Sequence, residues 1–290
     1  MKQYHLILVP VAIVFLSACG TQKDIRKTTE EDAGAVSARA LNRLANSSPE
    51  SLIKIATALE KSGNLKEASN VYTQALAVTP NHLGAQLGIA RIMIATGQRE
   101  AALKSLNDIQ ENHTLSAQNK TELAKLYMDL QHYDQSLALV EPLTAQSTGR
   151  QIAFVGILHE LKGNSTKARE LFDRARRQQG IAESFSKLIA YSFALDGAYE
   201  TAVALLQPIL NNQTTREDGR MALAYIYAMS GQYQPAVKLM RSVHGDDYVK
   251  SRQTMIKMLP LMNRQEKAEV LLFERVRAET VKRLLPIVKK

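Results

Sequence analysis

Residues 218–237 read DGRMALAYIYAMSGQYQPAV, and this stretch decides the fold. Small residues stand at Ala224 and Ala236, and bulky residues such as Leu223 flank them at helical spacing. Two antiparallel helices can approach closely only where their side chains are small. Gly231 lies between the two segments, where a residue with positive φ would end the first helix. The stretch therefore predicts a closely packed helical hairpin.

The same pattern recurs through the chain, with repeats that start at residues 49, 83, 117, 149, 183, 217 and 249. Position 8 of the repeats holds a small residue in all but the last: Ala56, Ala90, Ala124, Gly156, Ala190, Ala224 and Ile256. Position 20 is small throughout: Ala68, Ala102, Ser136, Ala168, Ala202, Ala236 and Ala268. The turn carries Gly63, Gly97, Gly163, Gly197 and Gly231, with Gln131 and Asn263 in the third and seventh repeats. Repetition at this period predicts stacked helical hairpins.

This register resembles that of the tetratricopeptide repeat family. The resemblance implies an all-α fold: a right-handed superhelical solenoid of about seven tetratricopeptide helix pairs over residues 49–282. In the seventh pair Ile256 replaces the small residue, and we expect this pair to form a terminal cap. Its polar outer face would consist of Arg264, Gln265, Lys267 and Glu269. The basic tail, residues 283–290, would extend the cap or fold back onto it.

Prolines predict local departures from regular hairpins. Pro142 and Pro208 both fall inside the second helix of their repeats, where a missing N–H should kink the helix or end it early. Pro235 falls in the first turn of a second helix, where proline is tolerated.

The first residues indicate export and lipidation. Lys2 precedes an apolar run from Leu6 to Leu16, which is too short to cross a bilayer and fits a signal peptide over residues 1–18. Leu16-Ser-Ala-Cys19 resembles the bacterial lipobox, and this resemblance implies cleavage before Cys19 and acylation of its thiol. The alternative is an ordinary secretory signal with an incidental cysteine. Cys19 is the one cysteine of the chain, so no intrachain disulfide can form.

Beyond Cys19, residues 19–32 are polar and without periodicity, and they predict a flexible lipidated tether. Residues 33–48 have apolar residues at helical spacing, which predicts an N-terminal helix. Gly20 follows the cysteine where some lipoproteins have aspartate. By resemblance to enterobacterial lipoproteins, the absence of aspartate at this position implies sorting to the periplasmic face of the outer membrane.

Composition and motifs argue against catalysis. The formal charge of +9 favours anionic lipid, cell-wall polymer or an acidic protein as a partner, or reflects only a basic solvated surface. No nucleic-acid module, phosphate-binding glycine loop or nucleophile elbow is visible. His159 falls at a packing position, which favours a structural histidine. We therefore expect no enzyme, no metal site, no small-molecule substrate and no cofactor other than the lipid on Cys19.

The first helices of the pairs predict a partner-binding groove, because the concave face of a solenoid is its usual binding surface. Side chains at positions 5 and 9 should point into it: Arg91, Lys125, Lys187, Tyr191, Met221 and Tyr225. The groove would be cationic towards its N-terminal half and aromatic towards its C-terminal half. Such a lining suits an extended or helical peptide with acidic and apolar residues.

Residues 218–237, together with the lipobox, short tether and repeats, resemble the TadD family, tetratricopeptide lipoproteins of the tight-adherence (Flp-type) pilus. The resemblance implies a role in pilus assembly, helping an outer-membrane secretin or other components to localise and oligomerise. Alternatives of the same class are a pilotin for type IV pili, a β-barrel assembly subunit and an adaptor for peptidoglycan hydrolases. An envelope enzyme with a tetratricopeptide module belongs to another class, and the lack of a sizeable domain outside the repeats argues against it.

Overall fold

The computed structural model describes residues 48–178 and 182–289. The signal peptide, Cys19, the tether and the N-terminal helix expected from the sequence lie outside the described residues. Within those residues the chain is helical and contains no strand. It divides into two compact units, one ending at Ala85 and the other beginning at Gln86. The all-α fold of stacked helix pairs predicted from the sequence is confirmed.

The described part of the first unit contains the helical hairpin of α2 (Pro49–Lys61) and α3 (Leu65–Val78). Ser48 caps α2 by accepting a hydrogen bond from the backbone N–H of Ser51. Between the helices the small residues Ala56 and Ala68 are wholly buried, as the repeat register predicts. The hydroxyl of Tyr72 donates a hydrogen bond to Glu60 Oε2 at 2.9 Å, which satisfies its buried polar end.

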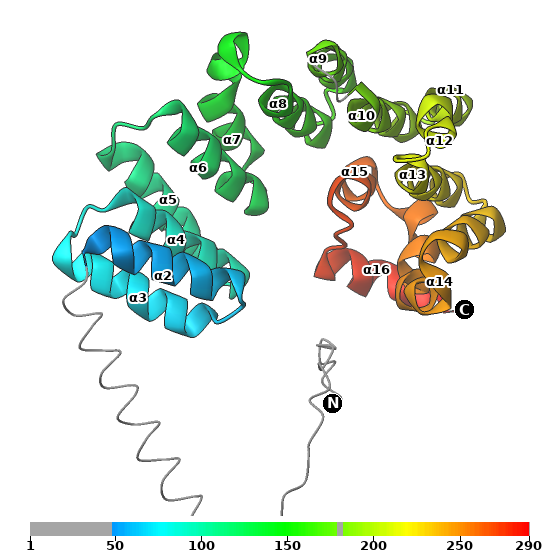
Figure 1. Ribbon diagram of the computed structural model, residues 1–290. Helices are drawn as coiled ribbons and strands as arrows, with labels where there is room; N and C mark the ends of the chain where they lie inside the picture. Colours follow the sequence, from blue (N-terminus) through cyan, green and yellow to red (C-terminus); the bar gives the residue numbers. More distant parts are fainter. Residues whose placement is uncertain (1–47, 179–181, 290) are drawn as a thin grey trace, which may run out of the picture. The chain divides into compact units, whose positions relative to one another are not determined.

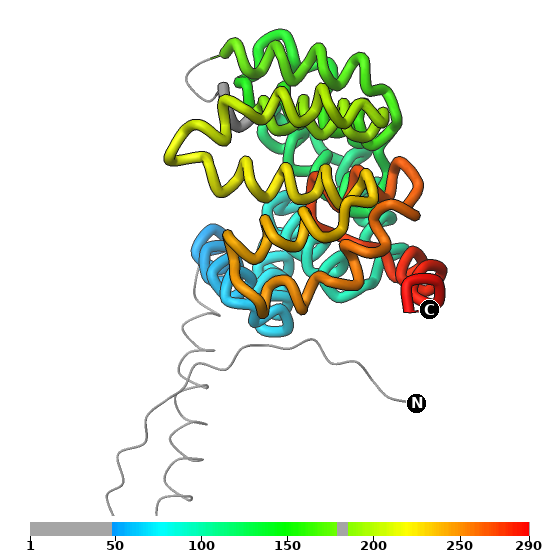
Figure 2. The backbone as a smooth tube through the Cα atoms, turned by 90° about the vertical axis from the view of Figure 1, so that its right-hand side faces the viewer, coloured from blue at the N-terminus to red at the C-terminus, as the bar shows by residue number. Residues whose placement is uncertain are grey.

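Helix α4 (Leu83–Ala95) spans the boundary between the units, and the second unit continues as helix pairs. Its helices are α5 (Arg99–Asn112), α6 (Ala117–Asp129), α7 (Tyr133–Val140), α8 (Gly149–Leu161), α9 (Ser165–Arg177), α10 (Ala182–Leu195), α11 (Tyr199–Leu205), α12 (Gln207–Asn211), α13 (Arg216–Met229) and α14 (Tyr233–Met258). In this unit α6 packs on α7, α8 on α9, α10 on α11 and α13 on α14. Figure 2 shows the last of these pairs in yellow and orange.

The turns and prolines behave as the sequence predicts. The five turn glycines all have positive φ, and Gln131 keeps the same conformation at φ 68°. The second helix of the third repeat ends before Pro142: α7 stops at Val140, and a 3₁₀ helix follows over Glu141–Gln146. At Pro208 the second helix of its repeat breaks into α11 and α12.

The seventh pair departs from the predicted hairpin. Helix α14 runs across the sixth and seventh repeats with a kink at Gly245, whose φ is 81°. A short 3₁₀ turn (Leu259–Leu261) then leads to α15 (Arg264–Phe273) and α16 (Ala278–Val288). Asn263 does not take the positive φ of the turn glycines. Instead its side chain caps α15 in a capping box with Glu266.

Helix α15 lies on the first helices of earlier repeats rather than forming an outer cap. It contacts α8, α10 and α13, and α16 packs on α14. Figure 1 shows α15, in orange, on the inner side of the row formed by these three helices. The prediction that Arg264 and Glu269 belong to a polar outer face is therefore wrong. Ala268 is wholly buried, as its position in the repeat predicts.

Candidate functional site

The inner face of α8, α10 and α13 is the strongest candidate for a binding site, and here the chain's own helix α15 occupies it. Two charged side chains of α15, Arg264 and Glu269, reach the earlier repeats. Each forms polar contacts with residues of repeats that are not its neighbours in the sequence.

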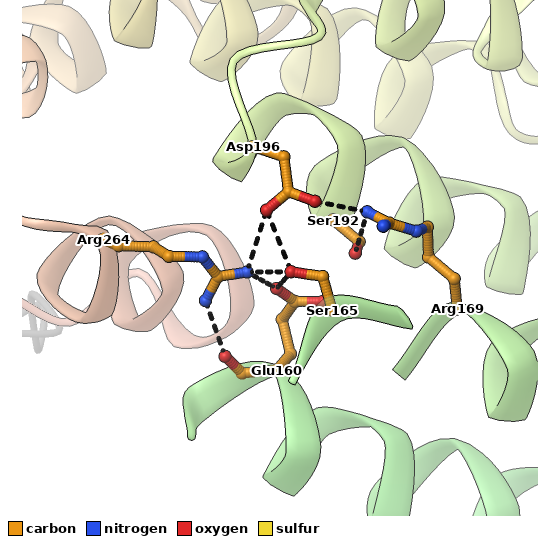
Figure 3. A network of polar contacts seen from close by, with 6 residues as sticks. All are labelled: Glu160, Ser165, Arg169, Ser192, Asp196 and Arg264. Carbon is orange, nitrogen blue, oxygen red and sulfur yellow. Dashed lines mark hydrogen bonds and ion pairs between the residues drawn. The ribbon is translucent and has the colours of Figure 1, made fainter. Parts of the chain in front are cut away.

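Arg264, the first residue of α15, enters a site at the ends of α8 and α10 (Figure 3). Its guanidinium forms an ion pair with the carboxylate of Glu160 and donates to the backbone carbonyl of Glu160 at 2.9 Å. It also donates to Ser165 Oγ at 2.5 Å and lies 3.4 Å from Asp196 Oδ1. We call the acceptor groups of Glu160, Ser165 and Asp196 the guanidinium site.

The position of these acceptors on their helices explains why they need a cation. Glu160 lies in the last turn of α8, with 1% of its surface exposed, and Asp196 directly follows α10. The carboxyl end of a helix carries a partial negative charge, so carboxylates there are unfavourable unless a cation is close. Arg264 supplies such a cation from a distant part of the sequence.

Asp196 has a second cationic neighbour, Arg169. The guanidinium of Arg169 lies 2.6 Å from Asp196 Oδ2 and 4.5 Å from the centre of the Phe193 ring. Burial alone would raise the pKa of Asp196, but hydrogen bonds from Arg169 and Ser165 hold that pKa below its ordinary value. The site therefore contains ionised carboxylate.

Glu269 forms the second contact of α15 with the earlier repeats. Glu269 is 4% exposed, and its carboxylate accepts a hydrogen bond from the hydroxyl of Tyr133 at 2.8 Å. Arg277, which follows α15, forms an ion pair with the same carboxylate. Burial, and then the hydrogen bond and negative charge of Glu269, raise the pKa of Tyr133 to about 12. Tyr133 thus remains a hydrogen-bond donor at neutral pH.

The aromatic half of the predicted groove is not open. Tyr191, Met221 and Tyr225 are all buried, with exposed fractions of 9% or less. Burial and the nearby Glu274 carboxylate raise the pKa of Tyr191. Burial is likewise the main cause of the raised pKa of Tyr225. The expectation that these side chains line an open groove is corrected. Helix α15, part of the C-terminal segment (residues 262–289), covers α10 and α13, from which they project.

The cationic half of the predicted groove is more accessible. Lys125 on α6 is exposed, and Lys187 on α10 is half-buried. Arg91 on α4 forms an ion pair with Glu122 on α6, so its charge is shared between two neighbouring repeats. The structure therefore separates the six predicted groove residues into an accessible basic set and a covered set of aromatic and sulfur-containing side chains.

The histidine expected to be structural is buried and paired. His159 Nε2 lies 3.0 Å from Glu141 Oε1 at the start of the 3₁₀ turn after α7. Among the described residues, no group of three or more histidine, cysteine or carboxylate side chains could hold a metal ion.

Sequence reasoning missed Glu160, Ser165 and Asp196, and it placed Arg264 and Glu269 on the wrong face. One local signal could have pointed to the site: Glu160 is an acidic residue in the last turn of a first helix, where its charge is unfavourable. Ile256, which replaces the small residue in the seventh repeat, also indicates that this pair packs differently.

Comparisons with known proteins agree with this architecture. Two tetratricopeptide repeat models match the chain, one over residues 59–119 and the other over residues 218–242. The chain contains tetratricopeptide repeats. Within the part of the chain that the structure describes, no helix is both long and apolar enough to span a membrane.

Several solved structures are similar in fold. A tetratricopeptide repeat protein from Parabacteroides merdae is 17% identical, with a TM-score of 0.60, over 83% of this chain and 99% of that one. The Pseudomonas aeruginosa protein pilF is 12% identical, with a TM-score of 0.51, over 71% and 97% of the two chains. A chain of the APC/C Cut9–Hcn1 complex is 13% identical, with a TM-score of 0.50. The match covers 70% of this chain and 42% of that one. At these identities the likeness shows the fold alone.

A curated relative matches a shorter stretch. The human protein O-mannosyl-transferase TMTC1 is 24% identical over 120 residues, which are 41% of this chain and 14% of that protein. The chain thus spans a small fraction of this relative's length.

Proposed function

We propose that this protein is a non-enzymatic scaffold that binds a helical segment of a partner protein on the inner face of its repeats. The observation that carries the proposal is the seating of α15 on α8, α10 and α13. A surface that holds a helix through a buried carboxylate, a tyrosine hydroxyl and apolar contacts has the features of a helix-binding groove.

We further propose that the scaffold is a lipoprotein of the outer membrane, facing the periplasm. The lipobox-like Leu16-Ser-Ala-Cys19 supports this proposal, and two or three acyl chains would hold the protein firmly. Labelling with radioactive palmitate tests it. The wild-type chain should be labelled and sediment with outer membranes, whereas Cys19→Ala should lose the label and the membrane association. Unchanged fractionation of Cys19→Ala would refute the anchor.

The cellular task that we propose is assembly of a tight-adherence pilus, in which the scaffold helps the secretin to localise or oligomerise. The resemblance of residues 218–237 and of the domain order to the TadD family supports this assignment. No catalytic group is required of a scaffold of this kind.

Crosslinking in cells that express the pilus genes tests this task. The wild-type protein should capture the secretin, and secretin multimers should decline when the protein is deleted. Capture of β-barrel assembly subunits or peptidoglycan hydrolases in place of the secretin would assign the scaffold to another envelope machine. Lys125→Glu, at an exposed position on α6, should reduce capture if the partner also contacts the basic set. Exposed Lys66→Glu on α3, a second helix, is the matched control.

A further inference from the structure

Helix α15 has the properties of a bound peptide. It is only ten residues long, begins with its own capping box and ends at Glu274, whose φ of 51° breaks the helix. Non-helical residues join it to the chain on both sides. A helix this short is marginal in water by itself, so its conformation depends on the surface that it contacts. That surface is formed by repeats far away in the sequence.

The guanidinium site is not fully used by Arg264. Of the two carboxylate oxygens of Glu160, Oε1 accepts from Arg264, whereas Oε2 is buried and has no hydrogen-bond partner among the described residues. A guanidinium can donate two parallel hydrogen bonds to a carboxylate, and this bidentate geometry is stronger than a single bond. The site can therefore bind a guanidinium through more hydrogen bonds to the Glu160 carboxylate than Arg264 makes.

There is also space beside the site. A pocket of about 520 Å³ shares Ser165 and Asp196 with the guanidinium site and continues along the start of α9. Arg264 keeps 30% of its side-chain surface exposed, and the pocket reaches Ser165 and Asp196, so solvent has access to both sides of this contact. Among the side chains in Figure 3, removal of Arg264 leaves Glu160 and Asp196 with Arg169 as their one cation. The vacated site would then favour a positive charge.

Glu269 defines the other end of the contact. Its carboxylate meets Tyr133 on α7, and Ala268 and Leu271, on either side of Glu269 in the sequence, are buried. The surface therefore fits a helix with a basic group in its first turn, a carboxylate in its second turn, and buried apolar residues on either side of that carboxylate.

From these contacts we propose that α15 occupies the partner site in cis, and that a partner helix with an arginine in its first turn and a carboxylate in its second displaces it. This inference rests on the proposed scaffold function and gives the ligand class of its inner face. The carboxylates of Glu160 and Asp196 recognise the partner's arginine, and the hydroxyl of Tyr133 recognises its acidic residue.

A synthetic peptide of residues 262–277, labelled with a fluorophore, tests the proposal in trans on the detergent-solubilised full chain. The wild-type chain should bind it weakly, because α15 competes. Arg264→Ala in the full chain should loosen α15 and tighten peptide binding about tenfold or more, since affinity rises with the fraction of open sites. Adding Glu160→Gln to Arg264→Ala should abolish this gain, and so should Arg264→Ala in the peptide.

Matched controls separate the site from general effects of charge. Arg241→Ala removes an exposed arginine that pairs with Asp246 on α14, and it should leave peptide binding as in the wild type. Equal binding by the wild-type and Arg264→Ala chains, or no effect of Glu160→Gln, would overturn the proposal.

If circular dichroism shows that Arg264→Ala is unfolded, hydrogen exchange of the wild-type chain tests the proposal without that variant. Excess unlabelled peptide should then accelerate hydrogen exchange in α15, and unchanged exchange would overturn the proposal. Because no pilus protein enters these assays, failure of secretin capture alone would refute the proposed task and leave the ligand class intact.

Discussion

Glu160, in the last turn of α8, and Arg264, the first residue of α15, form an ion pair although 104 residues separate them. The pair links the fourth repeat to the end of the array. A solenoid in which each repeat contacts only its neighbours would contain no such bond. The contact makes the C-terminal segment part of the inner face rather than an outer cap.

Removing either member of this pair should have unequal effects. Arg264→Ala leaves the buried Glu160 carboxylate without this cation and should lower the free energy of unfolding by about 2–4 kcal/mol. Glu160→Gln keeps a polar group of the same shape and should cost less, about 1–2 kcal/mol. Urea unfolding measures both. The exposed Arg177, paired with Asp173, supplies the control, and Arg177→Ala should cost roughly 0.5 kcal/mol or less. Equal losses for the three variants would contradict a buried site.

Gly156 is the one glycine at position 8, and Phe172 explains it. A Cβ on Gly156 would lie 2.6 Å from Phe172 Cε1, closer than carbon atoms can approach. Gly156→Ala should therefore destabilise the protein by about 1–3 kcal/mol, although alanine stands there in five other repeats. Combining it with Phe172→Leu, the residue used at Leu106 and Leu206, should recover most of the loss. Thermal unfolding of the single and double variants checks this, and additive losses would disprove the steric explanation.

Gln131 adopts the left-handed conformation that the other turns give to glycine, with φ 68°. For a residue with a Cβ this conformation costs about 1–2 kcal/mol. Gln131→Gly should therefore raise the midpoint of urea unfolding. Losing the 3.5 Å contact of Gln131 with Glu269 offsets only a small part of this gain. The reverse change, Gly97→Ala at φ 82°, should lower the midpoint, although nothing would crowd its Cβ. A lower midpoint for Gln131→Gly would show that its side chain matters more than its backbone.

Low pH should release the C-terminal segment. Burial would raise the pKa of Asp196, but hydrogen bonds from Arg169 and Ser165 lower it below its ordinary value of 3.8. Burial would likewise raise the pKa of Glu266, but hydrogen bonds from Arg283 and Thr280 lower it below its ordinary value of 4.5. A carboxyl with a lowered folded-state pKa stabilises the fold above its unfolded pKa, and this stability is lost as the pH falls through the folded value. The free energy of unfolding should hence be level between pH 7 and about 5 and fall below about pH 4. Asp196→Asn should flatten part of this fall, and an identical profile for that variant would contradict the assignment.

The repeat pattern was sufficient to predict the hairpins, because the determinants are local. Small residues such as Ala124 and Ala224 are wholly buried where two helices meet, and they recur with the repeat. Pro142 and Pro208 end or break their helices through the backbone alone, so their effect also follows from position in the repeat.

The site could not be predicted in the same way, because it depends on contacts across the array. Nothing in the sequence near Glu160 indicates that Arg264 reaches it. The repeat register placed Arg264 on an outer face and left Tyr191 and Tyr225 open, since it assumed that α15 would pack as a regular second helix. Asn263 is instead the N-cap of α15 and does not form a hairpin turn like those of the glycines.

Hydrogen exchange of α15, measured by mass spectrometry on the full chain at neutral pH, tests the central claim most directly. If α15 is seated on α8, α10 and α13, its later amides, from Ala268 to Phe273, should exchange far more slowly than in the isolated peptide 262–277. Arg264→Ala should raise this exchange while the amides of α9 stay protected. Exchange of these amides at the rate of the free peptide in the wild-type chain would contradict the account.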